Sequence, residues 1–170
     1  MKNHNGLRPQ DILVLLKIAA KGNKAWLMKD LANELNISPS EISESLNRSM
    51  LAGLLSADKQ KLMTASLLEF LQFGLKYVYP QKPGSIVRGM PTSHSALPLN
   101  KLIKSKEHYV WPYAQGQVLG QSIEPLYITV PKACEKDPLL YELLALTDAL
   151  RIGKSRERNL AITELKNRLL

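Results

Sequence analysis

The sequence predicts a mainly α-helical fold with small β elements, an α+β protein of 170 residues. Three observations lead to this prediction. Apolar residues recur at helical spacing through most of the chain. Proline stands at the start and glycine at the end of several of these segments, where helices commonly begin and end. Runs with the composition of strands are short and few.

The first predicted helix opens within Leu7 to Asp11, with Pro9 in its first turn, and is stopped by Gly22. Proline in a first turn already has the backbone angle of a helix, and glycine readily adopts the conformations that end one. This helix is expected to support the two that follow it. Its inner stripe is predicted to consist of Ile12, Leu15, Leu16 and Ala19.

The segment from Met28 to Arg48 predicts two short helices that cross through a tight turn, the helix-turn-helix arrangement. Ala32 is small, so the two backbones can approach closely there. Asn36 lies in the turn, where a left-handed backbone conformation is needed and Asn tolerates it. Ile37 then fills the turn. Such a scaffold presents its second helix to the major groove of DNA.

The second helix of this pair has a clear start signal. Ser38 is predicted to be the N-cap, with Pro39 in the first helical position and Glu41 completing a capping box. Helical spacing turns Ile42, Leu46 and Ser49 inward. The polar residues of this helix are candidate base-reading residues, namely Ser38, Ser40, Ser43, Glu44, Asn47 and Arg48, and all but the cap are expected to turn outward.

The two glutamates of this helix have separate interpretations. Glu41 is interpreted as the reciprocal member of the capping box. Glu44 either accepts a hydrogen bond from a cytosine amino group or pairs with Arg48 at i, i+4, and the pairing role is favoured. With Arg48 as its one cation, the segment from Pro39 to Ala52 carries a net negative charge, so phosphates would repel it unless the flanking segments compensate.

A short hairpin is predicted directly after the second helix. Gly53 ends that helix, Leu54 to Ser56 is a predicted strand, and the polar turn from Ala57 to Gln60 leads back into Lys61 to Met63. A hairpin in this position is a wing. Lys59 and Lys61 on it are placed to contact DNA phosphates.

Residues 7–63 therefore resemble the winged helix-turn-helix domain of MarR-type bacterial transcription regulators, over about a third of the chain. The resemblance implies a homodimer that binds double-stranded DNA sequence-specifically, with the recognition helix in the major groove and the basic wing on the backbone. There are two departures from the pattern. Met28 stands where such domains often have a Ser or Thr cap, and Glu44 stands where they often have Arg.

The segment from Thr64 to Tyr79 predicts a trailing helix, interrupted by Gly74, that packs beside the winged domain or forms part of a dimer interface. Residues 1–79 are thus predicted to be the DNA-binding domain. The aromatic residues of this helix are interpreted as core or interface rather than as a platform for bases. They are Phe70, Phe73 and Tyr77.

Residues 80–170 are predicted to form an α+β module for dimerisation or partner binding. The stretch from Gln81 to Leu99 is predicted to be a surface loop, because it is rich in Pro, Gly and Ser. It includes the segment Arg88 to His94. No acidic partner or phosphate cradle accompanies Ser93 and His94, so no enzymatic role is expected.

Two short strands are predicted in this module, Tyr109 to Tyr113 and Leu126 to Val130, with glycines in the turn between them. Trp111 and Tyr113 are expected to be buried rather than to stack on bases. Two helices follow, one with Asp137 as its cap and one from Ser155. The connection holds a basic cluster that either binds phosphate or is a solvated helix end, formed by Arg151, Lys154, Arg156 and Arg158.

Composition limits the partners, metal sites and cellular location that the chain can have. The chain has 23 Lys and Arg against 15 Asp and Glu, a net charge of +8, which suits a polyanionic partner. Cys134 is the single cysteine, which excludes an intrachain disulfide and a cysteine-based zinc site. No membrane segment is found in the sequence, no cofactor or metal is expected, and a cytoplasmic location is predicted.

Two function classes follow from the sequence. The leading hypothesis is a sequence-specific DNA-binding transcriptional regulator, a repressor, that acts without enzymatic activity. The alternative is a protein-interaction module, such as an antitoxin or adaptor, that keeps the winged-helix fold. Glu41 and Glu44 motivate this alternative, because an acidic helix suits a protein partner better than a phosphate backbone.

Overall fold

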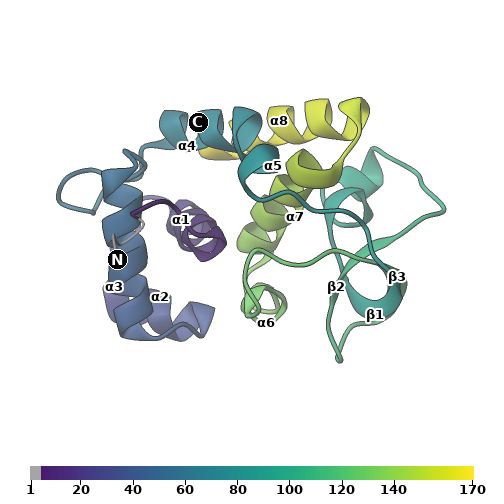
Figure 1. Ribbon diagram of the computed structural model, residues 1–170, viewed down its shortest axis with the longest axis horizontal. Helices are drawn as coiled ribbons and strands as arrows, with labels where there is room; N and C mark the ends of the chain where they lie inside the picture. Colours follow the sequence, from purple (N-terminus) through teal and green to yellow (C-terminus); the bar gives the residue numbers. More distant parts are fainter. Residues whose placement is uncertain (1–4) are drawn as a thin grey trace.

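The computed structural model describes residues 5–170, which form eight α-helices and three short strands (Figure 1). The N-terminal helices are α1 (Pro9–Lys21), α2 (Met28–Leu35), α3 (Pro39–Leu51), α4 (Thr64–Phe73) and α5 (Leu75–Val78). The strands are β1 (Ile86–Pro91), β2 (Tyr109–Pro112) and β3 (Val118–Ser122), and the C-terminal helices are α6 (Val130–Cys134), α7 (Pro138–Ile152) and α8 (Ser155–Leu169). The prediction of a mainly helical α+β protein is confirmed.

Helix α1 lies at the centre of the molecule, between α2 and α3 on one side and α7 on the other (Figure 1). Every residue from Asp11 to Ile18 is buried. The predicted inner stripe was too narrow, because Leu13, Val14 and Ile18 are also buried while Ala19 is only half-buried. A helix that is apolar on all sides is stable only when it is covered on all sides.

The three strands form a small closed sheet in which each strand pairs with both others. Strand β1 is antiparallel to β2 and β3, while β2 and β3 run parallel. Gly89 of β1 makes this closure possible, since a Cβ at that position would lie 2.0 Å from the backbone oxygen of Trp111. The sheet and α7 lie side by side in the C-terminal half (Figure 1).

Two predictions about this sheet were wrong. The predicted loop from Gln81 to Leu99 contains β1 and a short 3-10 helix, Ser93–Ser95, and a second one, Leu99–Lys101, begins at its end. The predicted strand from Leu126 to Val130 is a turn that leads into α6, because Pro131 occupies the start of that helix, where proline is favoured. Strand β3 includes Gly120 and takes the place of the missing strand.

The helix ends of the C-terminal half agree with the sequence. The Asp137 side chain accepts a hydrogen bond from the Leu140 N–H at 3.0 Å, and Pro138 begins α7. The basic cluster divides in two. The guanidinium of Arg158 donates to the Leu150 carbonyl at 2.6 Å and Arg151 is bonded inside the fold, whereas Lys154 and Arg156 are exposed.

A single hydrophobic core joins residues from both sides of the predicted boundary near residue 80. Leu15 and Leu31 belong to it, as do Leu144 and Leu165. A partly buried ion pair adds to this contact, because Lys17 Nζ of α1 lies 2.6 Å from the carboxylate of Asp137 at the start of α7. The division into residues 1–79 and 80–170 stays a prediction, and the two parts pack on one another.

Candidate nucleic-acid interface

Helices α2 and α3 meet at a left-handed residue. Asn36 follows α2 with φ 53° and ψ 46°, and Ile37 is buried in the turn. Ala32, where the two helices approach, is 6% exposed. These three residues behave as the sequence predicts, so the chain reverses sharply and places α3 across α2.

Only one of the two hydrogen bonds of the predicted capping box is formed at the start of α3. Ser38 Oγ accepts a hydrogen bond from the Glu41 N–H at 3.3 Å, and Pro39 follows in the first helical position. The Glu41 carboxylate does not return the bond to the Ser38 backbone. It accepts instead from Gln10 Nε2 of α1 at 2.6 Å, which ties the start of α3 to the central helix.

Most of the predicted base-reading residues lie on one accessible face of α3. Ser38, Ser40 and Glu44 are exposed, while Ser43 and Asn47 are half-buried. The inward positions are also as predicted, since Ile42, Leu46 and Ser49 are buried.

Arg48 contradicts the prediction that it turns outward. It is 7% exposed, and its guanidinium makes two hydrogen bonds with the fully buried carboxylate of Asp11 in α1, Nε to Oδ2 at 2.8 Å and Nη2 to Oδ1 at 2.7 Å. The same carboxylate accepts the Arg8 N–H at 2.8 Å. The hydrogen bonds with Asp11 raise the pKa of Arg48 above its ordinary value. Arg48 therefore fixes α3 to α1, and it is not available to a base or to Glu44.

Signals for this ion pair are present in the sequence. Asp11 precedes seven consecutive residues, Ile12 to Ile18, that are apolar except for Lys17. A carboxylate at the start of a helix that is buried on all sides needs a cationic partner. The sequence does not identify the partner, because Asp11 and Arg48 are separated by 37 positions.

The predicted strand from Leu54 to Ser56 is not formed, and the segment after α3 is a tight turn with one bridge between Leu55 and Leu62. Two backbone hydrogen bonds close it, Ser56 N–H to the Lys61 carbonyl at 2.9 Å and Met63 N–H to the Leu54 carbonyl at 3.0 Å. Lys59 has a φ of 60° at the tip. We call residues 54–63 the hairpin.

The hairpin places its two lysines differently. The ammonium of Lys59 donates to Oδ1 of Asn47, so it lies against α3. Lys61 is exposed. The tip also carries Asp58, whose pKa is lowered mainly by the hydrogen bond from the Ser56 hydroxyl. The accessible side of α3 and the hairpin therefore combines Glu41, Glu44 and Asp58 with only two cations, Lys59 and Lys61.

The segment around Ser93 and His94 is buried, with Ser93 in a left-handed conformation at φ 53°. His94 Nε2 lies 2.9 Å from the Glu107 carbonyl, and its ring packs edge-on against Tyr109. Among the described residues the Ser93 hydroxyl has no hydrogen-bond partner. Within this part of the chain no hydrogen bond joins the Ser93 hydroxyl to the His94 ring.

A buried polar cluster next to this segment was not predicted from the sequence. The Asp148 carboxylate of α7, 1% exposed, accepts from the Thr92 hydroxyl at 2.7 Å, the Trp111 indole at 2.6 Å and the Arg151 guanidinium at 2.9 Å. Arg151 also donates to the Tyr79 carbonyl at 3.1 Å. The cluster joins α7 to the sheet and to the end of α5. Trp111 is buried as the sequence predicts, whereas Tyr113 is only half-buried.

Within residues 5–170 no group of three or more His, Cys, Asp or Glu side chains is arranged to hold a metal ion. The helices of this part of the chain are all too short or too polar to cross a membrane. Burial raises the pKa of the Cys134 thiol. Comparison with known proteins finds no matching family model, and no curated protein or solved structure with significant similarity to this chain.

Proposed function

We propose that this protein is a sequence-specific DNA-binding transcriptional regulator with a winged helix-turn-helix of the MarR type. The observation that supports it is the accessible polar face of α3, preceded by the left-handed turn at Asn36 and followed directly by the hairpin. In this arrangement α3 enters the major groove and the hairpin is the wing. The mode of action is repression, and a homodimer on two half-sites supplies the affinity.

Asn47 is the principal base contact in this proposal. Its Oδ1 already accepts a hydrogen bond from Lys59, so the amide NH2 is left to donate. A single donated bond suits the N7 or O6 acceptors of a purine or O4 of thymine rather than the paired donor and acceptor of adenine. Glu44 is repelled by phosphates and instead accepts from a cytosine amino group.

Exposed apolar side chains on α4 and α5 support the homodimer. Phe73 is 65% exposed and Tyr77 is 72% exposed, so these aromatic residues contribute little to the core of the protomer. Burying them against a second copy would remove apolar area from water. Sedimentation of the wild type and a Phe73→Ser/Tyr77→Ser variant tests this interface, since the variant is expected to remain folded and become monomeric.

Binding of duplex DNA, measured by fluorescence anisotropy across a salt series, tests the main proposal. The duplex from the region upstream of the protein's own gene is compared with a random duplex. Asn47→Ala is expected to lower binding to the preferred site by about 5- to 150-fold and to leave random binding unchanged. Lys61→Ala is expected to weaken binding to both duplexes and to lower the salt slope by about 1.

Lys132→Ala, at an exposed cation on α6, is the matched control and should change neither measurement. Equal affinity for both duplexes, an absence of salt dependence, or a Lys61→Ala variant that behaves like Lys132→Ala would overturn the proposal.

A second candidate function is a protein-interaction module, an antitoxin or adaptor in which the outer face of α3 contacts a basic protein. The burial of Arg48 favours it, because this face then presents Glu41 and Glu44 without a cation from the same helix. Co-purification of a stoichiometric basic partner whose binding is lost in Glu44→Lys, with no affinity for duplex DNA, would favour this function over the first.

A further inference from the structure

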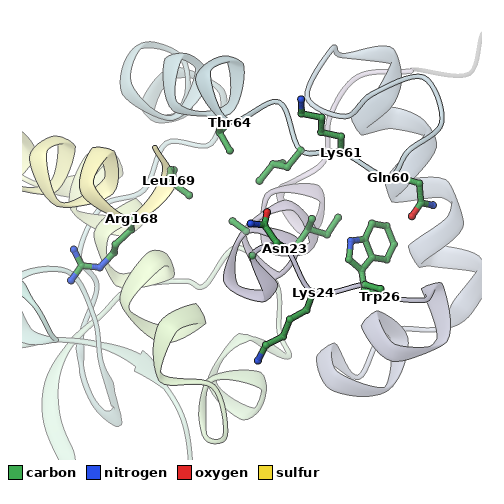
Figure 2. A pocket seen from close by; sticks show the side chains of 13 residues that line it. Asn23, Lys24, Trp26, Gln60, Lys61, Thr64, Arg168 and Leu169 are labelled. Carbon is green, nitrogen blue, oxygen red and sulfur yellow. The ribbon is translucent and has the colours of Figure 1, made fainter.

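A cleft of about 530 Å³ opens between the end of α1, the α1–α2 connection, the hairpin and the end of α8 (Figure 2). This volume lies in the range of small-molecule sites, roughly 300–1,000 Å³. Its apolar lining comes from Ile18, Ala19, Leu62 and Leu169. The cleft is separate from the outer face of α3, and the proposed DNA contacts share only Lys61 with it.

The polar lining of the cleft consists of amide, hydroxyl, indole and cationic side chains, and it contains no carboxylate side chain. Lys61 and Lys24 extend from opposite edges of the cleft with their ammonium groups directed outward, and the Trp26 indole and the Asn23 amide lie between these edges (Figure 2). Both lysines are exposed. Within residues 5–170 neither ammonium has a side-chain partner, and the indole N–H of Trp26 has no acceptor.

Arg168, the third cation at the cleft, does not add to the positive charge that a ligand would meet there. Arg168 is bonded to Glu142 at 2.7 Å and to Glu164 of its own helix. Its charge is therefore compensated within the protein. The uncompensated positive charge among the lining residues comes from Lys24 and Lys61, and the half-buried aromatic ring of Trp26 also lines the cleft.

We propose that this cleft binds a free nucleotide, with its base against Trp26 and its phosphates held by Lys24 and Lys61, whose flexible side chains turn inward to reach them. An aromatic ring stacks on a base, a long flexible lysine reaches a phosphate as a point charge, and an unpaired indole N–H and an amide supply hydrogen bonds to acceptor-rich ligands. Two uncompensated cations match a polyanion better than a monocarboxylate, which would leave one of them unpaired.

Tryptophan fluorescence without any DNA tests this proposal independently of the regulator function. Trp111 is 1% exposed and bonded to Asp148, so a ligand in the cleft quenches Trp26 and leaves Trp111 unchanged. ATP is expected to give saturable quenching, with adenosine and inorganic phosphate each binding at least about tenfold more weakly. Trp26→Phe should abolish the quenching.

The lysine variants identify the phosphate contacts. Lys24→Ala and Lys61→Ala are each expected to weaken ATP binding about tenfold, the effect of one lost charge-assisted contact. Lys104→Ala, at an exposed lysine outside the cleft, is the matched control and should bind as the wild type does. Thermal melting checks that every variant is folded.

Three results would overturn the proposal. One is the absence of saturable quenching by millimolar ATP in the wild type. Another is equal ATP affinity in Lys24→Ala, Lys61→Ala and Lys104→Ala. The third is quenching by a single-stranded oligonucleotide but not by ATP, which would assign the cleft to a nucleic-acid strand. None of these outcomes bears on duplex binding by α3, so the two proposals can fail separately.

Discussion

Replacing Arg48 by Met should strongly lower the free energy of unfolding, and this loss of stability, rather than a lost base contact, should be its primary effect. Methionine retains most of the aliphatic volume of the arginine stem but removes both guanidinium hydrogen bonds from the fully buried Asp11 carboxylate, which keeps the hydrogen bond from the Arg8 N–H. Breaking a buried ion pair by removing one partner costs about 3–5 kcal/mol. Two lost hydrogen bonds to charged groups, at about 1.5–3 kcal/mol each, give a similar figure.

Urea unfolding followed by circular dichroism measures this loss. A domain of ordinary stability has about 5–15 kcal/mol in total, so the variant should unfold at a clearly lower urea concentration. Arg156→Met, at an exposed cation on α8, is the matched control and should stay within about 0.5 kcal/mol of the wild type.

The double variant Asp11→Asn/Arg48→Met adds a sharper test. Asparagine keeps an oxygen that can accept the Arg8 N–H and removes the buried charge, so the double variant should be more stable than Arg48→Met alone. The reasoning is refuted if Arg48→Met lies within about 1 kcal/mol of the wild type, or if the double variant is the less stable of the two. Loss of duplex preference at unchanged stability would instead return Arg48 to the base-reading residues.

Three further outcomes are expected. Asp148→Ala should lower the free energy of unfolding by about 3–5 kcal/mol and change the near-ultraviolet circular dichroism of Trp111, because it removes a buried acceptor of three donors; a spectrum like that of the wild type would contradict this. Asn36→Ala should cost about 1 kcal/mol while Asn36→Gly costs less, as measured by urea unfolding, since alanine is strained at φ 53°. Burial would raise the pKa of Glu34, but hydrogen bonds from Lys17 and Lys21 lower it overall. The contribution of Glu34 to stability is therefore complete above its ordinary pKa near 4.5 and is lost as pH falls through the depressed pKa. Glu34→Gln should flatten the curve of stability against pH in that window, and an unchanged curve would count against a stabilising contact between Glu34 and the two lysines.

The N-terminal helices could be predicted from the sequence because their signals are local. Pro9, Asn36, Ser38 and Gly53 each act through their own backbone angles or through a neighbour three residues away, and all four are found as predicted. The sheet could not be predicted in this way. Glycine and proline in β1 resemble loop punctuation, whereas Gly89 is required by a close approach to Trp111, which comes 22 positions later in the sequence.

The candidate site was only partly predictable for the same physical reason. Helical spacing correctly separated Ile42 and Leu46 from Ser40 and Glu44, because a period of 3.6 residues identifies the middle of each face. Arg48 lies at the border between the faces, where the period does not decide. Its orientation is set by the Asp11 carboxylate of α1. Because Asp11 is buried, the guanidinium of Arg48 that pairs with it is buried too.

The burial of Arg48 also changes what DNA binding by this protein should look like. With Lys59 and Lys61 as the cations on the α3 and hairpin side, at most two phosphates are neutralised there per protomer, which gives a salt slope of about −1.8. Affinity would then fall only about tenfold between 50 and 200 mM salt for each protomer. Attraction of this size is weak, so a regulator built this way must obtain its preference from base contacts by Asn47 and Glu44 and its affinity from a second protomer. A steep slope would mean instead that cations outside this face bind the backbone, and the exposed Lys154 and Arg156 would then be the first to replace by alanine.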